Sequence, residues 1–163
     1  MSAPPPTTHD LLEFIAASPT PKHCCAEVIT RLEQRGFKPL SMGQAWDLEI
    51  GAGYYVVRGG ALVGFVVGEM PAAEAGFRLI GAHTDSPNLR IKPIADVHNK
   101  GYRQLGVEVY GGALTYTWLD RDLGLAGEVM LRGEGSAEIT TKLLRIDEPI
   151  ARIPSLAIHL NRD

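Results

Sequence analysis

The chain has 163 residues, of which 45% are hydrophobic and 21% are charged, and its formal net charge at pH 7 is -3. This balance is ordinary for a soluble globular protein and allows a hydrophobic core of useful size. A slightly acidic chain without a lysine and arginine cluster offers nucleic acid no general attraction, so we expect no nucleic-acid partner. Residues 1–12 lack a basic stretch followed by an apolar run, and no apolar segment is as long as a membrane span. We therefore expect a cytoplasmic protein without a membrane partner.

Two helices are expected at the start of the chain. A pair of threonines precedes a short helical pattern of apolar residues at 11–15. The Ser-Pro-Thr-Pro run at 18–21 ends this helix, because proline cannot donate a backbone hydrogen bond and restricts the residue before it. A second helix is expected over about residues 22–35, followed by Gly36, which readily adopts the left-handed conformation that ends helices.

Two adjacent cysteines, Cys24 and Cys25, fall within the second helix. Neighbouring cysteines cannot form the usual loop-closing disulfides, and they lack the spacing of a structural zinc pair. A small metal cluster with His23 is conceivable, but two packed apolar side chains are the better interpretation. Two adjacent cysteines without a disulfide framework indicate a reducing compartment.

Short β-rich runs follow the helices and are separated by turns that contain glycine. The expected strands cover residues 54–58, 61–67, 77–82, 107–110, 114–118, 127–131 and 139–144. The later runs have no helical pattern between them, so the second half of the chain is expected to be antiparallel and rich in β-structure. This change of character places a boundary near residues 89–96. Trp46, Tyr54 and Tyr55 are expected to pack in the core or on strand faces.

The most informative motif is a His-x-Asp at the end of the apolar run 77–82, where His83 and Asp85 precede a Ser-Pro turn. In open α/β sheets, ligands bind beyond the carboxyl ends of the strands, and a period of two points both side chains to one side. A neutral imidazole ligates zinc, and a nearby carboxylate can fix its tautomer or hold a neighbouring ligand. The three letters alone favour a turn histidine over a metal ligand. One histidine also cannot hold a catalytic metal, which needs about three protein ligands.

A longer block around this motif, residues 81–93, resembles the signature around the first metal ligand of M18 aminopeptidases. Other blocks resemble that family in the same order along nearly the whole chain. They are residues 36–37 with Trp46, then 54–58, 110–112, 117–123 and 153–162.

The resemblance implies roles for three residues. His83 matches a histidine that ligates one metal of a dinuclear site, and Asp85 matches the aspartate that positions or tunes that ligand. His159 resembles a histidine of an inserted domain that reaches the partner subunit's active site, where it polarises the substrate carbonyl or stabilises the tetrahedral intermediate. Without the family, His159 lies in the apolar run 156–160 and would be interpreted as a core histidine. The Asp-Arg-Asp run at 120–122 is a charged turn to which the sequence gives no catalytic task.

The resemblance also implies a fold and a function. The implied fold class is α/β, with part of a mixed-sheet metallopeptidase catalytic domain in residues 1–90 and part of a β-rich dimerisation domain in residues 91–163. The implied activity is removal of amino-terminal residues, preferably Asp or Glu, from peptides by a homo-oligomer that is built from dimers, a dodecamer. The implied cofactor is zinc, with two divalent ions per active site, and manganese or cobalt are alternatives.

A dinuclear site needs a bridging carboxylate, a general base and further ligands, and in the family these follow the inserted domain. We therefore expect this chain to be an incomplete portion of the enzyme and to be inactive alone. One alternative is a non-catalytic oligomerisation module or fragment of the same protein. A weaker alternative is another metallohydrolase with a His-x-Asp motif, such as an amidase.

Overall fold

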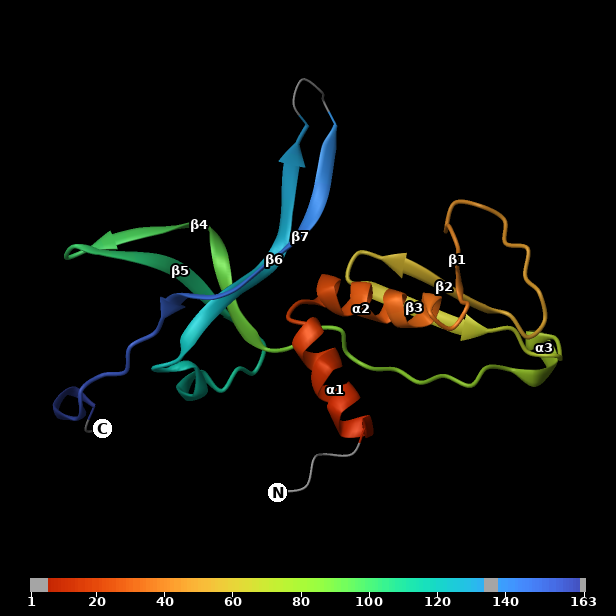
Figure 1. Ribbon diagram of the computed structural model, residues 1–163, viewed down its shortest axis with the longest axis horizontal. Helices are drawn as coiled ribbons and strands as arrows, with labels where there is room; N and C mark the ends of the chain where they lie inside the picture. The colour runs from red at the N-terminus through yellow and green to blue at the C-terminus, as the bar shows by residue number, and fades with distance from the viewer. Residues whose placement is uncertain (1–5, 134–137, 162–163) are drawn as a thin grey trace. The chain divides into compact units, whose positions relative to one another are not determined.

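A computed structural model of the chain describes residues 6–133 and 138–161 (Figure 1). These residues form two compact units. The first unit comprises the described parts of Met1–Asp85 and Gly127–Leu143, and the second those of Ser86–Ala126 and Leu144–Asp163. The fold is mixed α/β with small sheets, as the sequence predicts.

Two helices open the first unit, α1 (Pro6–Ala17) and α2 (Pro21–Glu33). Thr20 caps α2, because its side-chain oxygen accepts a hydrogen bond from the backbone N–H of His23 at 3.3 Å. Beyond the helix, Gly36 takes a φ of 81°, the left-handed conformation that ends α2. Both predicted helices are confirmed.

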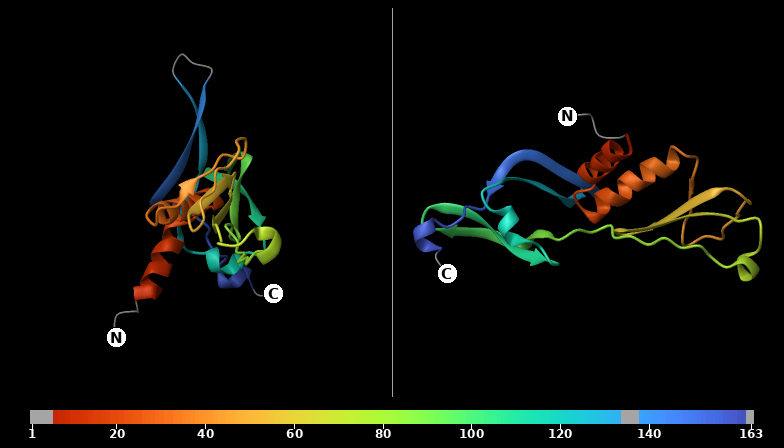
Figure 2. Two further views of the ribbon diagram at one scale, coloured as in Figure 1. Left: turned by 90° about the vertical axis from the view of Figure 1, so that its right-hand side faces the viewer. Right: turned by 90° about the horizontal axis from the view of Figure 1, so that it is seen from below.

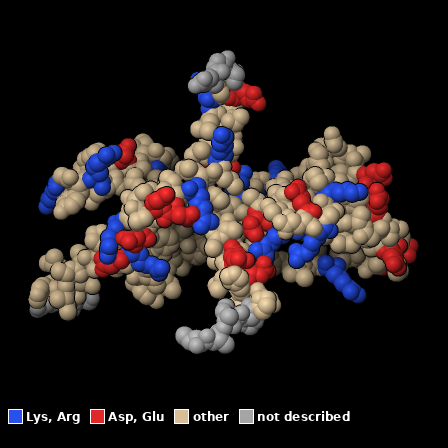
Figure 3. All heavy atoms as spheres, in the orientation of Figure 1, with Lys and Arg blue, Asp and Glu red and all other residues tan. Residues whose placement is uncertain are grey.

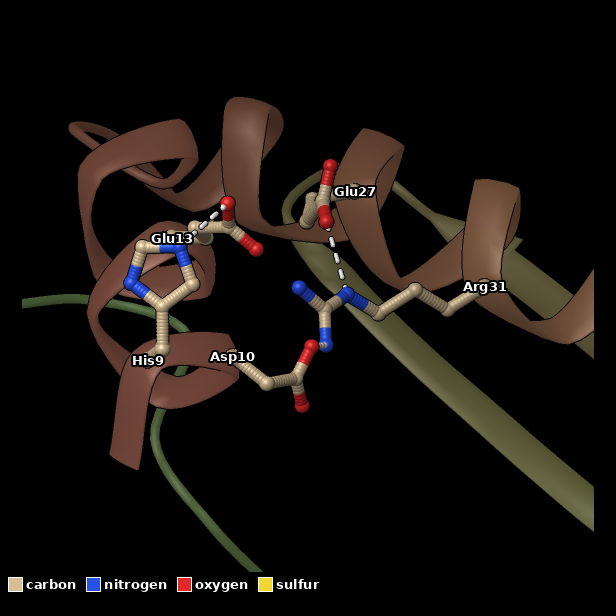
Figure 4. A network of polar contacts seen from close by, with 5 residues as sticks. All are labelled: His9, Asp10, Glu13, Glu27 and Arg31. Atoms are coloured by element: carbon tan, nitrogen blue, oxygen red, sulfur yellow. Dashed lines mark hydrogen bonds and ion pairs between the residues drawn. The ribbon is translucent and has the colours of Figure 1, made fainter. Parts of the chain in front are cut away.

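Polar side chains join the two helices of the first unit (Figure 4). The guanidinium of Arg31 donates to Glu27 Oε1 and to Asp10 Oδ1, each at 2.7 Å, and lies 5.2 Å from the ring centroid of Phe14. Arg31 and Glu27 are four residues apart on α2, whereas Asp10 and Phe14 belong to α1. One arginine thus fixes α1 against α2 through charge and through its planar face.

A three-stranded sheet packs beside α2, in the order β1 (Lys38–Pro39), β2 (Gly53–Arg58) and β3 (Ala61–Val66) (Figures 1 and 2). Strands β2 and β3 form the predicted antiparallel hairpin, and β1 pairs with β2 in parallel. A Cβ atom on Gly53 would lie 2.8 Å from the ring of Phe37, so a larger residue at the start of β2 would force that ring to move.

The buried hydrophobic residues of the described chain lie at this helix–sheet contact: Cys24, Cys25, Tyr54 and Tyr55. Both cysteines are free thiols, and burial raises the pKa of Cys25 from its ordinary value of 9.0, so it stays protonated at neutral pH. The Tyr55 hydroxyl donates to Glu33 Oε1 at 2.6 Å. The predicted packing roles of both cysteines and both tyrosines are confirmed. Trp46 is 43% exposed and has its ring centroid 6.2 Å from that of Phe65.

The predicted strand at residues 77–82 is wrong. After the short helix α3 (Ala72–Ala75), the chain runs as an extended trace without a paired strand (Figure 2). Phe77, Leu79 and Ile80 are 79%, 87% and 101% exposed. Strand structure requires a hydrogen-bonding neighbour, and no described segment of this chain pairs with these residues.

The second unit begins with a long antiparallel hairpin of β4 (Asn88–Asn99) and β5 (Tyr102–Tyr110). Its turn contains Lys100 and Gly101, both with positive φ, as two-residue hairpins require. The register shifts between Ile91 and Asp96. The sequence predicts the end of β5 but not β4, which runs through the expected boundary.

Two further strands follow, β6 (Asp122–Arg132) and β7 (Ile139–Arg152), and they pair with each other. They confirm the strands expected at 127–131 and 139–144 and are longer than predicted. The strand expected at 114–118 is wrong, because Thr115–Trp118 forms the 3-10 helix η1. A second 3-10 helix, η2 (Ile158–Leu160), follows β7.

Charges of both signs are mixed on the face of the molecule that Figure 3 displays. None of the described helices has the length and apolar character needed to cross a membrane.

Candidate metal centre

His83 and Asp85 lie close together at the end of the exposed segment of the first unit. Their Nδ1 and Oδ1 atoms are 3.1 Å apart, and the His83 side chain is 90% exposed. Between them, the Thr84 hydroxyl donates to the backbone carbonyl of Gly60 at 2.7 Å, in the turn between β2 and β3. Thr84 thus ties the motif to the sheet, and the two flanking side chains remain together.

The contact fixes which nitrogen of His83 can bind a metal. An ionised carboxylate only accepts hydrogen bonds, so we place the proton on Nδ1. The lone pair of Nε2 is then available for an ion, as in carboxylate–histidine–zinc arrangements. The donor chemistry of His83 therefore fits zinc.

The remaining ligands of such a site are not assembled here. No group of three or more His, Cys, Asp and Glu side chains that could hold a metal occurs among residues 6–133 and 138–161. A catalytic zinc site takes about three protein ligands. The described residues therefore fit one ligand with its orienting carboxylate and not a whole centre.

His159 lies on η2 of the second unit, and its side chain is exposed. The interpretation of His159 as a core histidine is therefore wrong. The 3-10 turn is closed by a hydrogen bond from the N–H of Leu160 to the carbonyl of Ala157 at 2.8 Å.

The Asp-Arg-Asp turn at 120–122 makes contacts that the sequence did not reveal. Asp120 binds Ser155, which is 35 residues further along the chain. No spacing rule links residues so far apart, so the only available signal was the acidic turn itself.

The sequence profile of the family described as aminopeptidase I zinc metalloprotease (M18) matches residues 14–163. The chain belongs to the M18 family. This membership confirms the resemblance of the sequence blocks and establishes a family of zinc peptidases.

Similar M18 proteins occur in several bacteria. The chain is 51% identical over 156 residues to a probable M18 family aminopeptidase 2 of Streptomyces coelicolor, covering 96% of this chain and 35% of that protein. It is 48% identical over 160 residues to a probable M18 family aminopeptidase 2 of Mycobacterium leprae, covering 98% of this chain and 37% of that protein. The chain thus spans about a third of the length of these relatives.

Two solved structures share the fold of this chain. A cryo-EM structure of the Ape4 and Nbr1 complex matches with a TM-score of 0.87 and 42% identity, over 94% of this chain and 30% of that chain. The structure of the S. cerevesiae mApe1 dodecamer matches with a TM-score of 0.84 and 34% identity, over 94% of this chain and 36% of that chain.

Proposed function

We propose that this M18 protein, in its whole length, is a metal-dependent aminopeptidase that removes amino-terminal Asp or Glu from peptides. The observation that carries the proposal is the 3.1 Å contact between His83 and Asp85 within a chain of the M18 family. The preference for an acidic residue rests on the family resemblance of the sequence.

The proposed centre holds two divalent ions, zinc being the leading choice and manganese or cobalt the alternatives. When bound, such ions act as Lewis acids toward the scissile carbonyl and activate water for attack. His83 offers Nε2 to one ion, and Asp85 keeps the His83 proton on Nδ1. The general base and the other ligands belong to the remaining two thirds of the relatives' length, so these 163 residues alone are inactive.

His159 is proposed to serve the active site of a partner subunit. Its exposed imidazole on η2 suits a donor that reaches outward. A donor aimed at the oxyanion of the tetrahedral intermediate contributes about 3–4 kcal/mol. This role requires a homo-oligomer that is built from dimers, and a dodecamer is proposed because the similar mApe1 assembles as one.

From the family resemblance of the sequence, residues 1–90 are proposed to form a catalytic portion and residues 91–163 a dimerisation portion. A cytoplasmic location is proposed with them. Free thiols at Cys24 and Cys25 suit a reducing compartment.

The test is hydrolysis of a peptide with amino-terminal Asp by the full-length protein, with a Leu-terminated peptide of otherwise identical sequence as control. We expect faster turnover of the Asp peptide, loss of turnover on chelation, and recovery when zinc, manganese or cobalt is returned. Turnover that survives exhaustive chelation would contradict metal dependence. Equal rates on both peptides would contradict the acidic preference.

The 163-residue chain serves as a second sample in the same assay. We expect no turnover from it at any metal concentration. An inactive full-length protein that still forms oligomers would favour the non-catalytic oligomerisation module.

A further inference from the structure

Asp120 lies at the centre of a set of contacts in the second unit. Its Oδ1 accepts a hydrogen bond from the backbone N–H of Ser155 at 3.2 Å, and its Oδ2 accepts one from the Ser155 hydroxyl at 2.5 Å. Its backbone N–H donates to the carbonyl of Ile153 at 2.8 Å. Arg152 donates to the backbone carbonyl of Asp120 at 3.0 Å. One residue thus contacts the last residue of β7, Arg152, and two residues that follow the strand, Ile153 and Ser155.

The neighbouring residues continue the same attachment. Leu119 forms a parallel bridge with Ile153, and the Arg152 guanidinium lies 3.4 Å from Asp122 Oδ1. The turn between η1 and β6 is therefore joined to the end of β7 by backbone and side-chain contacts. Sequence position separates these two segments by more than thirty residues, so the attachment is tertiary.

The backbone of Asp120 has a φ of 55°, in the left-handed region. Residues other than glycine rarely adopt this conformation, and aspartate and asparagine tolerate it best. Residues held in sparsely populated conformations need surrounding contacts that over-determine them. The four hydrogen bonds around Asp120 are such contacts, and the left-handed turn aims both carboxylate oxygens at Ser155.

The attached segment carries His159. Residues 154–157 belong to no strand or helix, and η2 begins at Ile158. An irregular backbone gains little order from its own hydrogen bonds, so its course depends on where it is tied. Ser155 is tied to Asp120 four residues before His159.

We propose that Asp120 is a positioning residue that fixes the course of residues 153–158 and so holds His159 where it can reach the reacting carbonyl. This inference rests on the proposed role of His159. A displacement of about 1 Å in a catalytic group can cost about 100-fold in rate. Loss of the anchor therefore lowers kcat without removing any group that touches the substrate.

The test uses the full-length protein and two readouts: amide hydrogen exchange of residues 153–160, and kcat and KM on the Asp-terminated peptide. Asp120→Gly deletes both side-chain contacts and tolerates the positive φ, so it adds no backbone strain. Ser155→Ala removes only the hydroxyl contact, and Ser155→Thr keeps it. Asp96→Asn is the matched control, because it changes an exposed carboxylate of β4 that lies outside the attachment.

For Asp120→Gly we expect exchange in residues 153–160 to accelerate at least severalfold and kcat to fall about 10-fold to 100-fold, with KM and oligomeric state unchanged. Ser155→Ala should show a smaller change in the same direction, and Ser155→Thr should restore both readouts. Asp96→Asn should resemble the unmodified protein. If Asp120→Gly does not fold, the comparison of Ser155→Ala with Ser155→Thr decides alone.

Unchanged exchange and unchanged kcat in Asp120→Gly, or in Ser155→Ala where that variant decides, would overturn the inference. His159→Ala separates this failure from failure of the proposed function. If His159→Ala retains full kcat while Asp120→Gly accelerates exchange, the anchor exists but the role of His159 is wrong. If His159→Ala loses activity and the anchor variants change neither readout, the role of His159 stands and Asp120 does not position it.

Discussion

At the scale of single residues, the carboxylates of Asp85 and Asp120 have different roles because they accept hydrogen bonds from different donors. Asp85 accepts from a ring nitrogen at 3.1 Å and thereby leaves the opposite nitrogen of His83 for an ion. Asp120 accepts from a backbone N–H and a hydroxyl of Ser155 and thereby ties two chain segments together. In both, the donor decides what the carboxylate does.

The contact with Ser155 makes the anchor sensitive to acid. Hydrogen bonds from the Ser155 hydroxyl and then its N–H hold the pKa of Asp120 below its ordinary value of 3.8, because they favour the ionised form. A carboxyl with a lowered pKa in the folded state adds stability that is fully present above the unfolded value. That stability is lost as the pH falls through the folded value. We therefore expect protection of the Ser155 amide, relative to its intrinsic exchange rate, to be constant above about pH 5 and to fall below about pH 3.8.

Asp120→Asn provides the control, since asparagine keeps the shape and does not titrate. Its protection should be lower than that of the aspartate protein at neutral pH. The difference between the two proteins should shrink as the pH falls below 3.8. A difference that grows on acidification would contradict this assignment of charge.

At the scale of secondary-structure elements, α2 depends on the cap at its start. Thr20 accepts from the backbone N–H of His23, and its hydroxyl lies 2.7 Å from the Nδ1 atom of that histidine. Replacing a threonine cap by alanine costs about 1 kcal/mol. We expect Thr20→Ala to accelerate amide exchange in the first turn of α2 by about fivefold, the factor that corresponds to this free energy.

Thr30→Ala is the matched control in the same helix. The Thr30 hydroxyl is exposed and bonds back to the carbonyl of Ala26 at 3.1 Å, a contact that slightly weakens helices. Alanine has the higher helix propensity, so exchange in α2 should stay the same or slow. Equal acceleration by both substitutions would show that the cap adds nothing specific.

The elements that the sequence predicts well are those with local signals. Proline before α2 and Gly36 after it mark the ends of that helix, and the Gly-Gly turn marks the β2–β3 hairpin. The run 77–82 has the composition of a strand, but strand structure depends on a neighbour that the described chain does not supply. β4 was missed because it contains lysine, proline and charged residues, which its long pairing with β5 accommodates.

In the site, too, the sequence predicts local contacts and misses long-range ones. His83 with Asp85 is a short motif at spacing two, and the structure brings these side chains together. The contact of Asp120 with Ser155 depends on a tertiary fold and has no sequence signature. A contact between residues two positions apart can therefore be predicted from the sequence. The contact of Asp120 with Ser155 cannot, because it joins residues 35 positions apart.

At the scale of the whole molecule, the described chain buries few apolar side chains. The buried hydrophobic residues are Cys24, Cys25, Tyr54 and Tyr55, while many large apolar side chains of both units are exposed.

Ile80, at 101% exposure, lies three residues before His83. The chain spans 35% of the length of its Streptomyces coelicolor relative, and the proposed centre takes its further ligands from the remaining length. The exposed apolar segment 77–80 thus closely precedes the candidate metal ligand His83 in sequence.

The most direct test of this account is the amount of zinc bound per subunit of the full-length protein, measured by elemental analysis for the unmodified protein and for His83→Ala. We expect His83→Ala to lose zinc, because Nε2 of His83 is proposed as a ligand. Asp85→Ala should weaken binding by about 10-fold to 100-fold, since it removes only the orienting partner. His98→Ala, which alters an exposed histidine of β4, should bind as much zinc as the unmodified protein. Full zinc occupancy in His83→Ala would contradict the account.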